Sequence, residues 1–143
     1  MNTGNPVIEL CTQGIQAEMA GNAAEALDLY MQAWNLRMDD YDACVAAHYI
    51  ARHQESPQEM LRWNQASLDH ARAVNDSRVL EFYPSLYLNM GRTYELLGQQ
   101  HAARDCYALA GSVLENLGGG PYNDLVRNGV AAGLRRTSQL QET

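Results

Sequence analysis

The sequence predicts an all-α fold, and three observations support that prediction. Ala, Leu, Glu, Gln and Arg, which favour helix, dominate the composition. Alternating runs of β-branched residues, which would indicate strands, do not occur. Helix-breaking groups recur at intervals of helical length, and a chain of 143 residues with 46% hydrophobic content can bury the core of one domain.

The breaking groups divide the chain into seven expected helices. The groups are Gly21-Asn22, Ser56-Pro57, Asn75-Asp76-Ser77, Gly98 and Gly118-Gly119-Gly120-Pro121. The helices between them are expected over residues 6–20, 22–37, 40–53, 57–74, 77–97, 99–117 and 121–137.

Several helix ends have an identifiable physical cause. Ser56 with Glu59 three residues later forms a capping-box pattern, and a proline after it starts a helix without losing a needed N–H. Ser77 is expected to cap the fifth helix, and Gly98 to end it in the left-handed conformation. Pro84 lies inside the fifth segment, so it should kink that helix or mark its true start.

Composition and charge exclude several classes of function. The net charge is −7 and all ten basic residues are arginine, which argues against nucleic acid as a partner. No apolar run reaches the roughly 20 residues of a membrane span, and the N-terminal residues do not resemble a secretory signal, so we expect a cytoplasmic protein. Cys11, Cys44 and Cys106 form no C-x-x-C motif and are expected to pack as free thiols.

An internal repeat is the strongest pattern in the chain. Two segments, starting at Gly14 and Gly91, share five residues at identical spacing. The matched pairs are Gly14 with Gly91, Gly21 with Gly98, Ala26 with Ala103, Tyr30 with Tyr107, and Ala33 with Ala110. A weaker copy begins 34 residues after the first, with His48 in place of the glycine, and the last copy follows it after 34 plus nine residues.

The last copy resembles the tetratricopeptide repeat (TPR) family. It reads Tyr87-Leu88-x-Met90-Gly91-x-x-Tyr94, followed by Gly98, Ala103, Tyr107 and Ala110. The resemblance implies a single domain over residues 1–143, a right-handed superhelix of helix-turn-helix hairpins. The repeats would span about 7–38, 41–74 and 77–117, with a C-terminal cap helix at 121–137. It also implies a non-catalytic adaptor that binds a protein or peptide in a concave groove.

In TPR-like hairpins the first helix of each pair lines the groove, so helical spacing assigns the groove residues. The N-terminal end of the groove should be apolar, and the rest should carry arginines that could hold an acidic or carboxylate group. The groove faces are expected to be Ile8, Cys11, Ile15 and Met19; Asp42, Val45, Tyr49, Arg52 and His53; Ser85, Leu88, Asn89, Arg92, Glu95 and Leu96; and Asn123, Val126, Arg127 and Val130. The candidate peptide-binding residues are Tyr49, Arg52, His53, Asn89, Arg92 and Arg127.

Other interpretations stay open at this point. The arginines could instead pair with Glu18, Asp42 or Glu95 on neighbouring helices. The apolar first helix could be a homodimer face, which would make the protein a self-associating structural subunit. A remaining alternative is an all-helical enzyme, although no catalytic motif, cofactor motif or sufficient set of metal ligands is present; Cys44 and His48 alone are too few for a structural zinc.

Overall fold

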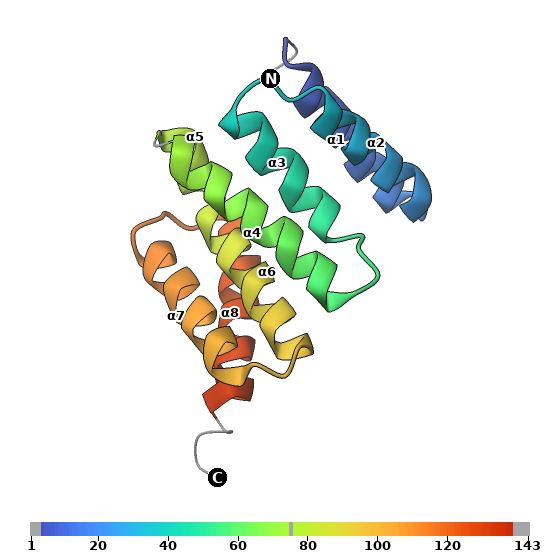
Figure 1. Ribbon diagram of the computed structural model, residues 1–143. Coiled ribbons are helices and arrows are strands. Elements are labelled where there is room, and N and C mark those ends of the chain that lie inside the picture. The colour runs from blue at the N-terminus through green and yellow to red at the C-terminus, as the bar shows by residue number, and fades with distance from the viewer. Residues whose placement is uncertain (1–3, 75, 139–143) are drawn as a thin grey trace. The chain divides into compact units, whose positions relative to one another are not determined.

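The computed structural model describes residues 4–74 and 76–138, and every regular element among them is a helix (Figure 1). The all-α prediction is therefore confirmed. The helices are α1 (Pro6–Met19), α2 (Ala23–Asn35), α3 (Asp40–Ala51), α4 (Pro57–Val74), α5 (Ser77–Leu80), α6 (Tyr83–Leu96), α7 (Gln100–Glu115) and α8 (Pro121–Ser138). None of these described helices is both long and apolar enough to cross a membrane.

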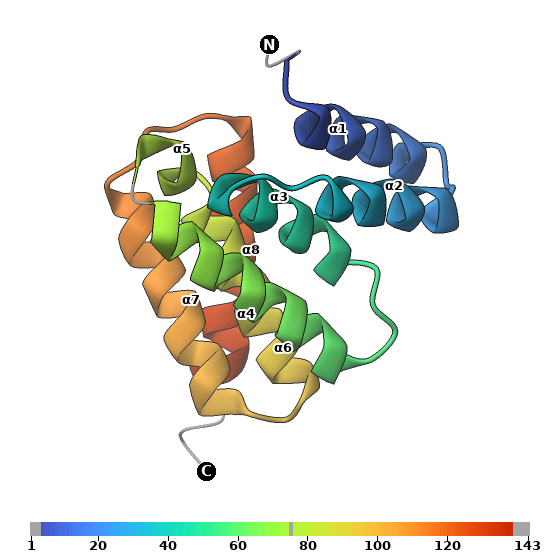
Figure 2. The ribbon, with the colours of Figure 1, turned by 45° about the horizontal axis from the view of Figure 1, so that its top comes forward.

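The chain forms two compact units, Met1–Asn75 and Asp76–Thr143. In the first unit, α1 pairs with α2 and α3 pairs with α4, while α3 also contacts α2 and α1. In the second unit, α6 pairs with α7, and α8 packs against both. Figure 2 shows α1 and α2 as neighbours in the first unit. The superhelical arrangement of TPR repeats stays a prediction.

The expected fifth helix is two helices. Glu81 and Phe82 separate α5 from α6, and Pro84 lies in the first turn of α6, where its missing N–H breaks no intrahelical hydrogen bond. Pro84 thus marks the true start of the helix. The expected cap at Ser77 is wrong by one residue, because Asp76 Oδ1 accepts the N–H of Arg78 at 2.9 Å.

Other helix ends follow the local sequence. Ser56 Oγ accepts the N–H of Glu59 at 3.1 Å, as the serine of the capping-box pattern predicts. Gly98 has φ of 78°, the left-handed conformation expected after α6. Asp39 caps α3 by accepting the N–H of Asp42 at 2.8 Å.

One glycine–tyrosine contact recurs in both units and sets how closely two helices approach. A Cβ atom on Gly14 of α1 would lie 2.3 Å from Tyr30 Cε1 of α2, far inside van der Waals contact. A Cβ atom on Gly91 of α6 would lie 2.6 Å from Tyr107 Cε1 of α7. Both tyrosines are fully buried. Small residues let the hairpin close, and the ring fills the space between its helices.

Helix α3 is buried on almost every side. Residues 42–48 are all buried, including Asp42 at 4% and Val45 at 3% exposure. The expectation that these two residues line an open groove is therefore wrong. Asp42 instead receives hydrogen bonds from Asn5 Nδ2 and from the N–H of Met38, both at 3.0 Å, so it fastens the segment before α1 to the start of α3.

Candidate functional site

Three predicted site residues, Tyr49, Arg52 and His53, gather around one carboxylate in the first unit. Arg52 Nη2 donates to Glu18 Oε2 at 2.6 Å, and His53 Nε2 lies 2.8 Å from Oε1. The hydroxyl of Tyr30 also donates to Glu18 Oε1, at 2.5 Å. Tyr49 stacks on Tyr30 with ring centroids 5.2 Å apart, and the Arg52 guanidinium lies 5.5 Å above the Tyr49 ring.

The electrostatics of this cluster favour an ionised Glu18. Burial by itself would raise the pKa of Glu18, but hydrogen bonds with His53 and Tyr30 and the charge of Arg52 outweigh it, so the pKa is lowered. Burial and the bond to Glu18 raise the pKa of Tyr30. Arg52 is thus engaged as the sequence alternative anticipated, in an ion pair between α3 and α1. A peptide contact for Tyr49, Arg52 or His53 stays a prediction.

The second unit contains a related cluster, and sequence reasoning missed its arginine. Arg136 of α8 donates to both oxygens of Glu95, at 2.9 and 3.1 Å, and the hydroxyl of Tyr107 donates to Glu95 at 2.5 Å. The hydrogen bonds of Arg136 and Tyr107 outweigh burial, so the pKa of Glu95 is lowered. A signal was available, because Glu18 and Glu95 have the same 77-residue spacing as the matched glycines and tyrosines.

Arg127 does not face the predicted groove. Its Nη2 donates to the carbonyl oxygens of Leu114 at 2.9 Å and Leu117 at 3.1 Å, which belong to the carboxyl end of α7 and the residues after it. A cation satisfies unpaired carbonyls there and complements the helix dipole. Val126 and Val130, which were expected beside it in the groove, are buried in the core. The predicted groove face of α8 is therefore its packing face, and that assignment is wrong.

Asn89, Arg92 and Leu96 share one face of α6, which we call the α6 face. Their spacing of three and four residues places them in one row. Arg92 is exposed, forms no ion pair with any described residue, and its Nη2 lies 3.1 Å from where a Cβ on Gly129 would be. Leu96 is 63% exposed. Of the three arginines predicted to bind a ligand, Arg92 alone forms neither an ion pair nor a hydrogen bond within the described chain, although its charge helps to lower the pKa of Glu95.

The predicted apolar end of the groove is only partly accessible. Cys11 is 2% exposed, so its assignment to the groove face is wrong, and burial raises the pKa of its thiol to about 12. Ile8 and Ile15 are half-buried, whereas Met19 is 83% exposed. The accessible part of this strip is small, and its use as a homodimer face stays a prediction.

Cys44 and His48 are both buried. Ser67 donates to the Cys44 carbonyl at 2.7 Å, and burial lowers the pKa of His48 to about 4. Among the described residues, no group of three or more His, Cys, Asp or Glu side chains is placed to hold a metal ion.

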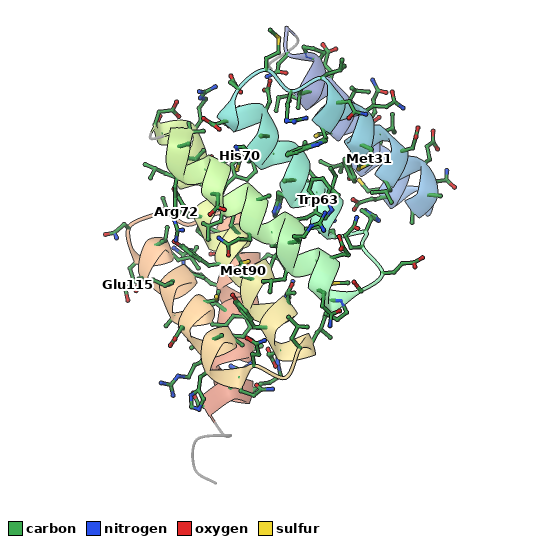
Figure 3. All side chains as sticks on the ribbon, in the orientation of Figure 1. Met31, Trp63, His70, Arg72, Met90 and Glu115 are labelled. Atoms are coloured by element: carbon green, nitrogen blue, oxygen red, sulfur yellow. The ribbon has the colours of Figure 1, made fainter. Side chains whose placement is uncertain are left out.

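The tryptophans of the first unit pack against each other. Trp34 of α2 and Trp63 of α4 meet edge to face with centroids 5.0 Å apart. Figure 3 labels Trp63. An open cavity of about 510 Å³ nearby is lined by residues of α2, α3 and α4 and the link between the first two. Its charged groups are already engaged: Arg37 lies 4.0 Å over Trp34, and Asp40 contacts His70 Nδ1 at 2.8 Å.

Comparison of the chain with protein-family models, curated proteins and solved structures finds no match. The resemblance to TPR proteins therefore rests on the residues of this chain alone.

Proposed function

We propose that this chain is a TPR-like repeat protein that binds a protein or peptide segment without catalysing a reaction, with the α6 face as a contact surface. The observation that carries the proposal is Arg92. It is an exposed cation that forms no ion pair among the described residues, although its charge helps to lower the pKa of Glu95. It lies beside an exposed leucine on the helix that lines the groove in the resembled family. Arginine is one of the residue types enriched at the hot spots of protein interfaces.

The repeated contacts support the repeat architecture. Each unit contains a glycine beneath a tyrosine, and in each unit the tyrosine hydroxyl bonds a glutamate one turn after that glycine. A chain that builds the same hairpin twice, with the same polar bond, fits a repeat protein whose exposed helix faces contact a partner. We infer that the partner presents an acidic group to Arg92 and an apolar group to Leu96, and that binding takes place in the cytoplasm.

The test is a pull-down from lysate of the source cells with three full-length proteins. These are the wild type, the double variant Arg92→Ala/Leu96→Ala, and the control Arg72→Ala, which removes another exposed arginine without an ion pair among the described residues. We expect a partner that the wild type and Arg72→Ala retain and the double variant loses.

A partner that all three proteins retain equally would show that the α6 face is not the contact surface. A chain that retains no partner, and that turns over a substrate in activity screens, would favour the enzyme alternative. Circular dichroism of each variant shows that a lost partner does not reflect unfolding. Both substituted side chains are exposed, so their removal is expected to change stability by less than about 0.5 kcal/mol.

A further inference from the structure

The outer side of α8 carries a self-complementary pattern. Asp124, Asn128, Ala131 and Arg135 are all exposed and lie at spacings of four, three and four residues, which places them in one row. We call this row the α8 outer strip. It faces away from Val126 and Val130, which are buried against α7 and α6. The groove contacts of α8 with α6, through Gly129 and Arg136, lie outside the strip.

We propose that a second copy of this chain docks on the α8 outer strip in antiparallel orientation, forming a two-fold symmetric dimer. In such a pair, with the axis between residues 129 and 130, residue i faces residue 259 − i. Asp124 of each copy then faces Arg135 of the other, and Asn128 faces Ala131. The charged residues at the two ends of the row have opposite signs, which is the arrangement that an antiparallel pair needs.

The charged groups at the two ends of the strip are available for this contact. The Asp124 side chain is 65% exposed, and its intramolecular partner is Arg127 through one oxygen at 3.2 Å. Such an exposed pair within one helix contributes little to stability, so it competes weakly with a new partner. Arg135 forms no ion pair with any described residue.

The middle of the strip suits close approach of two helices. Asn128 and Ala131 are short, so two helix backbones can come together there while the longer charged side chains meet at the ends. Leu125, which is 70% exposed, flanks the strip on the same side of the helix as Ala132, seven residues later, so the antiparallel pair brings Leu125 of each copy near Ala132 of the other. Burial of Leu125 supplies the apolar contribution, and the two Asp–Arg pairs fix the register.

The net charge of the chain explains why docking requires oppositely charged pairs across the strip. Each copy carries a net charge of −7, so two copies repel at long range. At physiological ionic strength this repulsion is screened beyond about 8 Å, whereas contact pairs across the strip are screened less. A second copy is therefore expected to dock on the α8 outer strip and not on the acidic remainder of the surface.

The test uses charge reversal in two matched variants. Asp124→Arg places Arg opposite Arg135 twice in the dimer, and Arg135→Asp places Asp opposite Asp124 twice, so each variant alone is expected to self-associate about tenfold more weakly than wild type. Mixed one to one, the two variants present opposite charges at both ends, and heterodimers are expected to form with wild-type affinity. Sedimentation equilibrium over a concentration series measures self-association, and native mass spectrometry identifies the heterodimer.

Two controls keep the result interpretable. Asp105→Arg makes the same charge change on an exposed position of α7 and is expected to leave self-association unchanged. Leu125→Asp weakens the dimer without reversing an existing charge, and it covers the case in which a reversal variant does not fold. A monomeric wild type, a wild-type dimer that neither reversal affects, or a mixture that forms no heterodimer would each overturn the proposal.

The result is independent of the α6 face. Arg92→Ala/Leu96→Ala removes the proposed partner contact and is expected to leave self-association unchanged. The charge reversals act on α8 and are expected to leave capture of the partner through Arg92 intact.

Discussion

The two units bury the same tyrosine in the same hairpin but cover it from the other side in different ways. In the first unit Gly14 lies beneath Tyr30, and Tyr49 of α3 stacks on the ring. In the second unit Gly91 lies on one side of Tyr107, and a Cβ on Gly133 of α8 would lie only 2.5 Å from the ring on the other. The hairpin is repeated, whereas the third helix is specific to each unit.

The same difference extends to the half-buried glutamate of each unit. Glu18 is held by one arginine and one histidine from adjacent positions of the chain, Arg52 and His53. Glu95 forms an ion pair with Arg136, which contacts both carboxylate oxygens, and the charge of Arg92 also acts on it. In each unit the third helix, or the end of that helix, supplies a basic side chain that pairs with the glutamate. The charge of the glutamate therefore requires a basic partner, but the repeat does not give the position of that partner in the sequence.

The largest effect is expected where a methyl group would enter the tyrosine pocket. Gly14→Ala, Gly91→Ala and Gly133→Ala each force a buried ring to move, and each is expected to lower the free energy of unfolding by about 3 kcal/mol. Gly111→Ala is the control, because its Cβ would meet Val130 at an ordinary 3.7 Å. Since alanine favours helix, that variant is expected to gain up to about 1 kcal/mol. Urea unfolding monitored by circular dichroism measures all four; a tolerated Gly133→Ala would show that α8 does not press on Tyr107.

The next largest effect is a loss of stability at low pH that arises from the first unit. His48 of the first unit is buried with a pKa of about 4, against 6.5 in the unfolded chain. Between these values the unfolded state binds a proton that the folded state excludes, so stability falls as the pH is lowered. We expect His48 to account for about 2 kcal/mol of lost stability between pH 7.5 and pH 5.

The matched variant for this prediction is His48→Gln, which cannot take up the proton. Urea unfolding of both proteins at the two pH values isolates the contribution of His48, since all other titrating groups are common to both. Equal losses in the wild type and His48→Gln would contradict a neutral buried histidine.

A smaller effect compares the two glutamates. The pKa of each is lowered in the folded state, so their contribution is present above pH 4.5 and is lost as the pH falls through the folded pKa. At pH 7, Glu18→Gln is expected to cost about 1.5 kcal/mol and Glu95→Gln about 1 kcal/mol, because Glu18 has a second charged or hydrogen-bonded partner in His53. These values are modest because Arg52 and Arg136 are about half exposed.

Unfolding of both variants at pH 7 and pH 3.5 checks this prediction. The difference from wild type should shrink at pH 3.5, because below pH 4.5 the unfolded wild type binds protons that the lowered pKa values exclude from the folded state. A difference that is the same at both pH values would mean that the charge of the glutamate does not matter.

The smallest effect on stability distinguishes Arg127 from Arg92, both of which the sequence predicted as peptide-binding residues. Arg127→Ala removes a cation from the carboxyl end of α7 and is expected to cost about 0.5 to 1 kcal/mol. Arg92→Ala is expected to leave stability unchanged. Thermal unfolding of the two variants, measured side by side with partner capture, tests the assignment. Loss of the partner in Arg127→Ala without loss of stability would restore Arg127 to the binding surface.

Much of the fold could be predicted because its causes are local. Helix ends at Ser56 and Gly98 depend on one side-chain cap and one left-handed residue, which the chain specifies within a few positions. The 77-residue spacing matched the glycines and the tyrosines of the two hairpins, whereas the contact of each glycine with its tyrosine came from the structure. Pro84 marked the start of α6, although the sequence left a kink as the other choice.

The candidate site could be predicted less well. Helical spacing placed Arg127 on the groove face, but α8 is turned so that this arginine contacts α7, about 200° around the helix from Gly129. Arg136 was not selected because its partner lies 41 residues away in the chain. Asn89 and Arg92 were placed on one face of α6, and their spacing is as expected because both lie within a single helix.

The sequence by itself determined the helices, the breaks between them and the matched positions of the glycines and tyrosines. Only the tertiary structure decided which arginine meets which carboxylate and which side of α3 and α8 is buried. The physical reason is the range of the interactions along the chain. Backbone hydrogen bonds, caps and turns act over a few residues, whereas the partner of a long arginine side chain depends on which groups packing brings near it. In α8 that packing is set by Gly129 and Gly133, which let the helix approach α6 and α7 and so fix its rotation.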